Sequence, residues 1–188
     1  AGGGGSGGPV PSVAEEVYLP SDEMFIKHWQ WGLDAINIAP MWGRTTLEQR
    51  AEITVAVIDS GVDMDHPDLI NSLVAGYDFV NDDEDPDDDF GHGTHVAGII
   101  GAEENNGGIV GAAPGVRIMP LKVLDEYGSG TTEDIFAAIE YAVEHGADVI
   151  NLSIGGEAKS MAEEDAVQDA LSCNIVVAAA AGNEYATE

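Results

Sequence analysis

The sequence predicts an α/β fold in which a parallel β-sheet lies between two layers of helices. Short apolar runs rich in Val and Ile alternate along the chain with segments of helical periodicity, and this alternation is typical of parallel sheets flanked by helices. The apolar runs lack the polar alternation of a half-exposed strand. They are therefore expected to be buried on both faces of the sheet.

Five segments are predicted as strands by their β-branched, apolar composition. They span residues 53–59, 74–80, 116–124, 148–153 and 175–180. Pro120 lies inside the third segment, so perfect pairing is not expected there. In α/β folds of this kind the functional residues lie at the carboxyl ends of the strands, and we search that edge of the sheet for chemistry.

Three segments are predicted as helices. Residues 93–102 are small and apolar, as in a buried helix, whereas residues 133–145 repeat apolar side chains at the spacing of an amphipathic helix. Residues 161–171 form the third. Ser160 and Glu163 have the spacing of a capping box at the start of this last helix.

Composition and charge narrow the possible functions. The 188 residues include 6 Lys+Arg and 35 Asp+Glu, a formal charge of −29. Such a chain is not expected to bind nucleic acid or an anionic membrane surface, because both need clustered basic side chains. No apolar run approaches the roughly 20 residues that span a bilayer. Cys173 is the single cysteine, which excludes an internal disulfide, and it is predicted to be buried.

Three polar side chains stand where chemistry is expected. Asp59 ends the first strand, and alone it is typical of a turn. His92 lies between two glycines, and a histidine held by a carboxylate can act as a general base near neutral pH. Asn183 follows the last strand, where an amide can cap a turn or donate to an oxyanion. His95 is interpreted as a packed structural residue rather than as half of a metal-binding pair.

Four motifs occur in order along the chain. They are VAVIDSGVDMDHPDL at residues 55–69, GHGTHVAG at 91–98, NLSIGG at 151–156 and VVAAAAGN at 176–183. Together they resemble the subtilisin-like serine peptidases (subtilases), over residues 31 to 183. The resemblance implies hydrolysis of protein or peptide substrates through an acyl-enzyme, in which Asp59 orients His92, His92 is the general base and Asn183 donates to the oxyanion.

Two glycine-containing segments have backbones that can pair with an extended peptide. They consist of Gly128, Ser129 and Gly130 in one segment and Ser153, Ile154 and Gly155 in the other. Each alone is more often an ordinary loop. By the resemblance they look like the strands that flank a peptide substrate.

The nucleophilic serine that the resemblance implies is missing from these 188 residues. In the family it lies in a Gly-Thr-Ser-Met-Ala motif after the oxyanion asparagine, but only five residues follow Asn183 and none is serine. Ser160-Met161-Ala162 lacks the preceding Gly-Thr and comes before Asn183. Ser160 is therefore assigned to the helix cap, and the chain alone is expected to be inactive.

Three explanations for the missing serine remain open. The chain is a fragment or truncated form of a peptidase, one piece of an enzyme whose serine lies on a second chain or a C-terminal segment, or an inactive pseudopeptidase that binds extended peptides. We favour the first two and expect residues 21–188 to be a peptidase domain incomplete at its C-terminus. Residues 1–20 are expected to be a flexible arm or linker, and the protein is expected to be secreted.

Calcium is the expected cofactor, in a structural role, because hard cations bind clustered carboxylates and carbonyls. The resemblance implies a first site formed by Asp22, Asp68, Glu103, Asn105, Gly107 and Ile109. It implies a second site formed by Asp78, Asn81, Asp83 and Asp85, at the acidic run NDDEDPDDD. The alternatives are an Asn-Gly turn at the first and a solvated acidic loop at the second.

Overall fold

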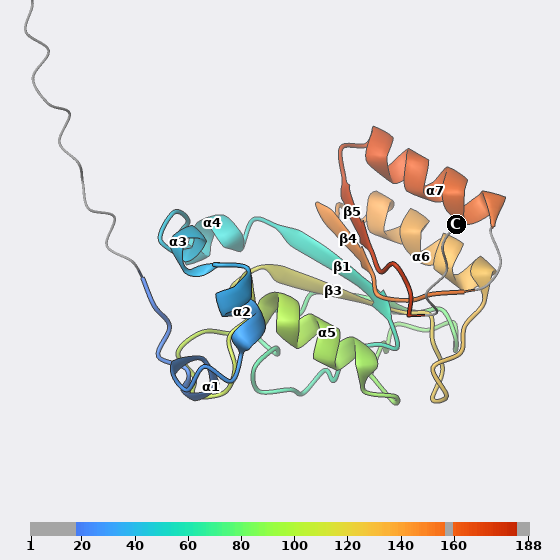
Figure 1. Ribbon diagram of the computed structural model, residues 1–188. Coiled ribbons are helices and arrows are strands. Elements are labelled where there is room, and N and C mark those ends of the chain that lie inside the picture. The colour runs from blue at the N-terminus through green and yellow to red at the C-terminus, as the bar shows by residue number, and fades with distance from the viewer. Residues whose placement is uncertain (1–17, 157–159, 184–188) are drawn as a thin grey trace, which may run out of the picture.

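The computed structural model describes residues 18–156 and 160–183. Its centre is an all-parallel sheet in the order β2-β3-β1-β4-β5 (Figure 1). The strands are β1 (Thr54–Asp59), β2 (Tyr77–Asp78), β3 (Arg117–Lys122), β4 (Val149–Leu152) and β5 (Val176–Ala179). The predicted fold class is confirmed.

The three predicted helices are present, and four short helices precede them. The predicted ones are α5 (His92–Gly101), α6 (Thr132–Glu144) and α7 (Met161–Ser172). The others are α1 (Glu23–Ile26), α2 (Trp31–Ala35), α3 (Ala39–Trp42) and α4 (Leu47–Arg50). A helix of one turn is too short to show helical periodicity, so these four were not predictable in that way. None of the described helices is long and apolar enough to cross a membrane.

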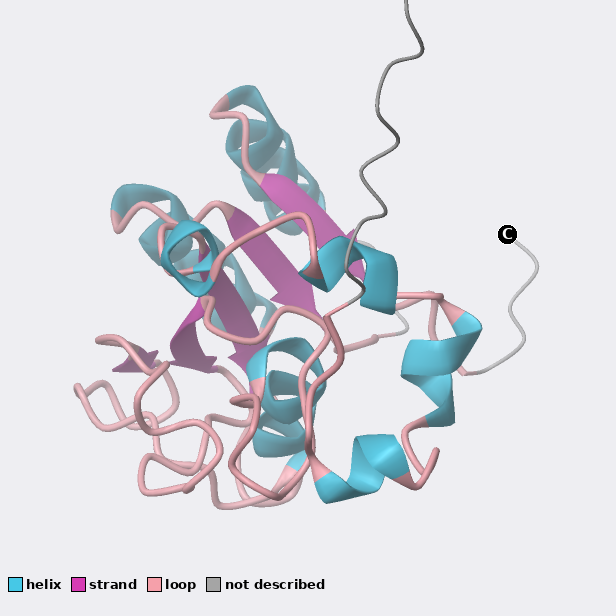
Figure 2. Cartoon of the chain, turned by 90° about the vertical axis from the view of Figure 1, so that its left-hand side faces the viewer, coloured by secondary structure: helices cyan, strands magenta, loops and turns pink. Residues whose placement is uncertain are grey.

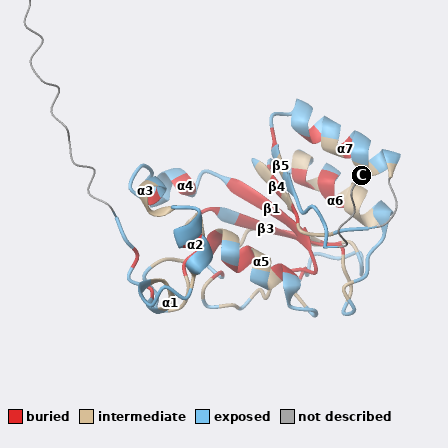
Figure 3. Ribbon diagram, viewed as in Figure 1, coloured by how far each residue is buried: buried red, intermediate tan, exposed pale blue. Residues whose placement is uncertain are grey.

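Helices cover both faces of the sheet, with α5 on one face and α6 and α7 on the other (Figure 1 and Figure 2). The central strand β1 shows how the two cores are built. Val55 and Val57 pack in a cluster with Ala97 of α5, whereas Ala56 and Ile58 pack in the cluster that includes residues of α6 and α7. All six residues of β1 are buried (Figure 3), which explains why the run lacks polar alternation.

Strand β2 is shorter than the predicted segment 74–80. Val74 donates its N–H to the carbonyl of Ile118, but regular pairing resumes only at Tyr77 and Asp78. Pro120 lies opposite the gap. Its nitrogen faces the same side as the N–H of Ile118, which donates to the carbonyl of Ser72, just before this segment. Proline has no hydrogen to donate there.

Strand β5 forms one edge of the described sheet and is largely exposed (Figure 3). Val176 at its start is 61% exposed. Cys173 is also exposed, so its predicted burial is wrong. It ends helix α7, and the left-handed backbone of Asn174 then turns the chain so that Ile175 takes the buried position instead.

Ser160 caps helix α7, as predicted. Its hydroxyl accepts a hydrogen bond from the backbone N–H of Glu163 at 3.2 Å. Ser160→Ala is therefore expected to lower the free energy of unfolding by about 1 kcal/mol. Ser160→Asn keeps a capping oxygen and is expected to lose much less. Urea unfolding followed by circular dichroism measures both variants, and equal losses would contradict the capping role.

Candidate active site

Asp59 and His92 form a hydrogen-bonded pair at the carboxyl edge of the sheet. Asp59 ends β1 and is fully buried, whereas the side chain of His92 at the start of α5 is 44% exposed. The ring atom Nδ1 lies 2.8 Å from Oδ1 and 3.0 Å from Oδ2 of Asp59. Because a carboxylate only accepts hydrogen bonds, Nδ1 is assigned the proton, and Nε2 is left to accept one. The pair is an oriented base.

The two glycines beside His92 have different roles. A Cβ atom at Gly93 would lie 2.1 Å from the carbonyl oxygen of Gly61 and 3.1 Å from Cβ of Asp59, so no side chain fits there. Gly91 has φ of +97° and occupies the position before the helix, a conformation that favours glycine. One glycine thus allows α5 to approach β1, and the other turns the chain into α5.

The carboxylate of Asp88 joins the end of β1 to the first turn of α5. Its Oδ1 accepts the hydroxyl of Ser60 at 2.8 Å and the backbone N–H groups of Gly91 at 2.8 Å and Phe90 at 3.1 Å. Its Oδ2 accepts the N–H of Thr94 at 2.9 Å and the hydroxyl of the same residue at 2.5 Å. Asp88 therefore satisfies helix donors that would otherwise lack partners.

Lys122 is buried beside the same junction. It ends β3 in register with Asp59 and is 1% exposed. Its Nζ donates to the carbonyl oxygens of Ser60 and Leu124, both at 2.8 Å, and to Oδ1 of Asp89 at 2.6 Å. A buried ammonium is tolerated where oxygen atoms accept its hydrogen bonds, and here each of the three N–H groups has an acceptor.

The first predicted substrate segment folds back on the chain that precedes it. Leu124 and Gly130 form an antiparallel bridge, and Asp125 bonds to the backbone of Ser129 in both directions. Gly128 has φ of +72° and lies against the ring of Phe90. The segment Gly128–Ser129–Gly130 is therefore one arm of a tight hairpin rather than an isolated strand.

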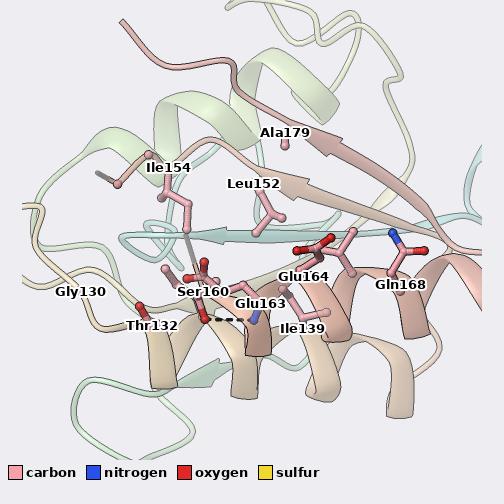
Figure 4. Close-up of a pocket in the computed structure, with 14 residues that line it drawn as sticks. Gly130, Thr132, Ile139, Leu152, Ile154, Ser160, Glu163, Glu164, Gln168 and Ala179 are labelled. Carbon is pink, nitrogen blue, oxygen red and sulfur yellow. Dashed lines mark hydrogen bonds between the residues drawn. The ribbon is translucent and has the colours of Figure 1, made fainter. Parts of the chain in front are cut away.

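The second predicted substrate segment leaves β4 in an extended form. Within the described part of the chain, the backbone groups of Ser153, Ile154 and Gly155 make no hydrogen bond to other backbone groups. Ile154, Gly155 and Gly130 line a pocket of about 700 Å³ that is closed on its other side by α6 and α7 (Figure 4). The two predicted segments thus meet at one pocket.

Asn183 follows β5 and is exposed. Strands β1, β4 and β5 are neighbours and parallel, so Asp59, Ser153 and Asn183 all come at or after strand ends on the same edge of the sheet. Residues 184–188 of the predicted peptidase domain lie outside the described residues, as do residues 1–17 of the predicted arm.

His95 is not packed, which contradicts its prediction. It is exposed, and its ring makes no hydrogen bond to any described residue. The buried face of α5 is formed by small residues, among them Gly93 and Ala97. His95 is two residues from each of these, which places it on the opposite side of the helix.

The first predicted calcium site has mixed features. The carboxylate of Asp22 is fully buried and accepts the backbone N–H groups of Asn105, Asn106 and Gly107 at 2.7 to 3.3 Å. The amide oxygen of Asn105 accepts the N–H and hydroxyl of Ser21 at 2.8 and 2.9 Å. Both side chains thus anchor this loop to the segment Ser21–Asp22.

Asp68 lies on the other side of this loop. A Cβ atom at Gly108 would approach its Oδ2 to 2.4 Å, so the loop backbone passes close to this carboxylate. No donor among the described residues bonds to the Asp68 carboxylate, and its oxygens are available to a cation. The side chain of Glu103 uses Oε1 to accept the N–H of Asn71 at 3.2 Å. The ligands predicted from Glu103, Gly107 and Ile109 are their backbone carbonyls.

The second predicted calcium site contains a carboxylate that the chain already satisfies. Asp78 is 2% exposed, and it accepts the backbone N–H groups of Val80 and Asn81 and the side-chain amide of Asn81 at 2.7 to 2.9 Å. Asp83 accepts the N–H of Asp85, and both are exposed. Across residues 18–156 and 160–183, no group of three or more His, Cys, Asp and Glu side chains is placed to hold a metal ion. A cation at either site would need carbonyl and amide oxygens as well.

Comparison with known proteins gives consistent matches. A family model described as the subtilase family matches residues 50–188. The chain is 46% identical over 182 residues to a thermophilic serine proteinase of Bacillus sp. (strain AK1), covering 93% of this chain and 45% of that protein. It is 41% identical over 167 residues to thermitase of Thermoactinomyces vulgaris, covering 88% of this chain and 58% of that protein.

A solved structure shows the same likeness. The crystal structure of a cold adapted subtilisin-like serine proteinase superposes with a TM-score of 0.63 at 39% identity, covering 70% of this chain and 46% of that one. The chain thus spans about half the length of the relatives that it matches.

The Asp88 network has a consequence for acid stability. Burial raises the pKa of the Asp88 carboxyl, but hydrogen bonds from Thr94, Gly91 and Ser60 outweigh burial and hold its pKa below the usual value. The folded state then binds this proton less readily than the unfolded chain. The stabilisation by Asp88 is therefore complete above the ordinary aspartate pKa of about 3.9 and is lost as the pH falls through the lower folded value.

Asp88→Asn is expected to remove this pH-dependent stabilisation, because the amide does not titrate. Its free energy of unfolding should depend less steeply on pH below about pH 4 than that of the parent chain. Urea unfolding at a series of pH values measures the difference. Curves of identical steepness in the acid range would contradict the assignment.

Proposed function

The chain belongs to the subtilase family, and on this basis we propose that it forms the part of a serine endopeptidase that supplies the base and the oxyanion donor. The observation that carries this proposal is the Asp59–His92 pair, with Nδ1 of the ring 2.8 Å from the buried carboxylate. An intact acid–base pair favours catalysis over a role limited to peptide binding.

In the proposed reaction, Nε2 of His92 takes the proton of a serine hydroxyl while the serine oxygen attacks the peptide carbonyl carbon. The side-chain amide of Asn183 donates to the oxyanion that forms. His92 then returns the proton to the leaving amine, and an acyl-enzyme remains that water hydrolyses by the same acid–base steps. The serine comes from a C-terminal segment or a second chain carrying a Gly-Thr-Ser-Met-Ala motif.

The proposed substrate is an extended segment of protein or peptide. The backbone of Ser153, Ile154 and Gly155 is extended and lacks backbone partners among the described residues, which suits pairing with a peptide strand. The hairpin arm that contains Gly130 lies at the same pocket. This arrangement supports a substrate held between the two segments, with one side chain in the pocket.

A structural calcium ion is proposed at the first site. The features that support it are the carboxylate of Asp68, which has no hydrogen-bond partner among residues 18–156 and 160–183, and the close passage of Gly108 past that carboxylate. Left-handed backbone conformations at Asn105 and Gly107 give the loop its tight shape. The ion would be held by Asp68 and carbonyls of the loop, with the amide oxygen of Asn105 as a ligand in place of a bond that it accepts from Ser21. It would neutralise part of the local negative charge.

The catalytic proposal is tested with a chromogenic peptide substrate. The 188-residue chain alone is expected to give no turnover, and a longer form or a mixture that supplies the serine motif is expected to be active. In that active form, His92→Ala should lower kcat by about 10⁶-fold, the size of loss known from subtilisin itself.

His95→Gln is the matched control for this experiment. It removes an exposed imidazole from the same helix, and it should leave kcat unchanged. Turnover by the chain alone that survives His92→Ala would mean that the site is wrongly assigned.

The calcium proposal is tested by thermal unfolding. Protein saturated with calcium and then treated with excess chelator is expected to melt at a lower temperature, because an ion bound only to the folded state stabilises that state. Asp68→Asn should abolish most of the difference. Identical melting temperatures with and without chelator would contradict the site.

A further inference from the structure

Ser60, the residue after Asp59, is held at both its side chain and its carbonyl. Its hydroxyl donates to Asp88 at 2.8 Å and accepts the backbone N–H of Gly93 at 2.9 Å. Its carbonyl oxygen accepts Nζ of Lys122 at 2.8 Å. Ser60 is fully buried. One hydroxyl therefore ties the residue beside Asp59 to the residue beside His92.

We propose that Ser60, Asp88, Asp89 and Lys122 form a positioning unit, the Ser60 clamp, that holds the Asp59 carboxylate against Nδ1 of His92. The inference rests on the proposed function, in which His92 must present Nε2 as an acceptor. In this proposal each of the four residues acts through the Asp59–His92 pair.

The hydrogen bonds of Asp59 explain why the clamp affects His92. Its Oδ1 accepts both the backbone N–H of Ser60 and Nδ1 of His92, each at 2.8 Å. The position of Ser60 therefore sets the direction of this carboxylate. In a neutral histidine, the hydrogen bond that the ring makes decides which of its two nitrogens carries the proton. A displaced Ser60 would weaken the preference for the proton on Nδ1.

The two acids of the clamp have different partners. Asp88 binds the Ser60 hydroxyl and the donors at the start of α5. Asp89 pairs with Lys122, and the same ammonium also binds the carbonyl of Leu124, next to the predicted substrate hairpin. The end of the acidic run, interpreted from sequence as a solvated loop or a cation site, thus bonds directly to the residues around the Asp59–His92 pair.

A role limited to anchoring the loop is the competing explanation, and the tautomer of His92 distinguishes the two. Long-range ¹H–¹⁵N correlation spectra of the ¹⁵N-labelled chain, recorded at about pH 9, identify the protonated ring nitrogen. His92→Gln assigns the resonances. Thermal unfolding of each variant measures the anchoring contribution separately.

Each variant changes one side chain of the clamp. Ser60→Ala removes the bridging hydroxyl, and Asp88→Asn places an amide N–H₂ against groups that are themselves donors. Asp89→Asn, at a side chain 49% exposed, is the mildest change. Glu84→Gln is the matched control, because it removes the same charge from the same loop at an exposed carboxylate that accepts no hydrogen bond from the described residues. Ser60→Thr keeps the hydroxyl and should retain the tautomer of the parent chain.

The parent chain and Glu84→Gln are expected to hold the proton of His92 mainly on Nδ1. Ser60→Ala and Asp88→Asn are expected to move the majority to Nε2, and Asp89→Asn is expected to shift the balance partly. Lower melting temperatures with an unchanged tautomer in every folded variant would overturn the clamp alone. A parent chain without the Nδ1-protonated form would contradict the Asp59–His92 contact, and with it both the clamp and the proposed function.

Discussion

Helix α5 begins so close to the end of β1 that Gly93 has no room for a side chain beneath it. This approach brings His92 within hydrogen-bonding distance of the buried Asp59. It also buries the backbone N–H of Gly93, and a buried polar group without a partner is costly. The hydroxyl of Ser60 accepts the N–H of Gly93, and Asp88 accepts that of Thr94. The arrangement of the whole edge depends on the contact between these two elements.

The strong negative charge of the chain is partly used inside the fold. Asp22, Asp78 and Asp88 each accept three or more hydrogen bonds, most of them from backbone N–H groups of their own or neighbouring loops. Carboxylates are effective acceptors for such donors because charge-assisted hydrogen bonds are stronger than neutral ones. Several acids that look like surface charge in the sequence therefore shape loops of the fold, and Asp78 and Asp88 do so at the carboxyl edge of the sheet.

Sequence patterns predicted the features that depend on long periodic segments or on contiguous motifs. The sheet, helices α5 to α7 and the role of Ser160 as a cap are of this kind. The exposure of His95 and Cys173 was missed because it depends on which face of a helix, or which residue of a turn, meets the core. The bonds of Ser60 to Asp88 and Lys122, 28 and 62 positions away, were not visible in the sequence. The first exists only once α5 packs on β1, and the second only once β1 and β3 are in register.

Lys122 ends its strand as an amine sealed at the edge of the sheet that carries Asp59. An acylating reagent will modify Lys27, whose side chain is 47% exposed, while the protein is folded. It can reach Lys122, at 1% exposure, only when the end of β3 separates from β1 or the loop carrying Asp89 lifts away. The rate of labelling at Lys122 therefore reports how often this edge opens. Labelling of Lys27 in the same molecule serves as the internal reference for that rate.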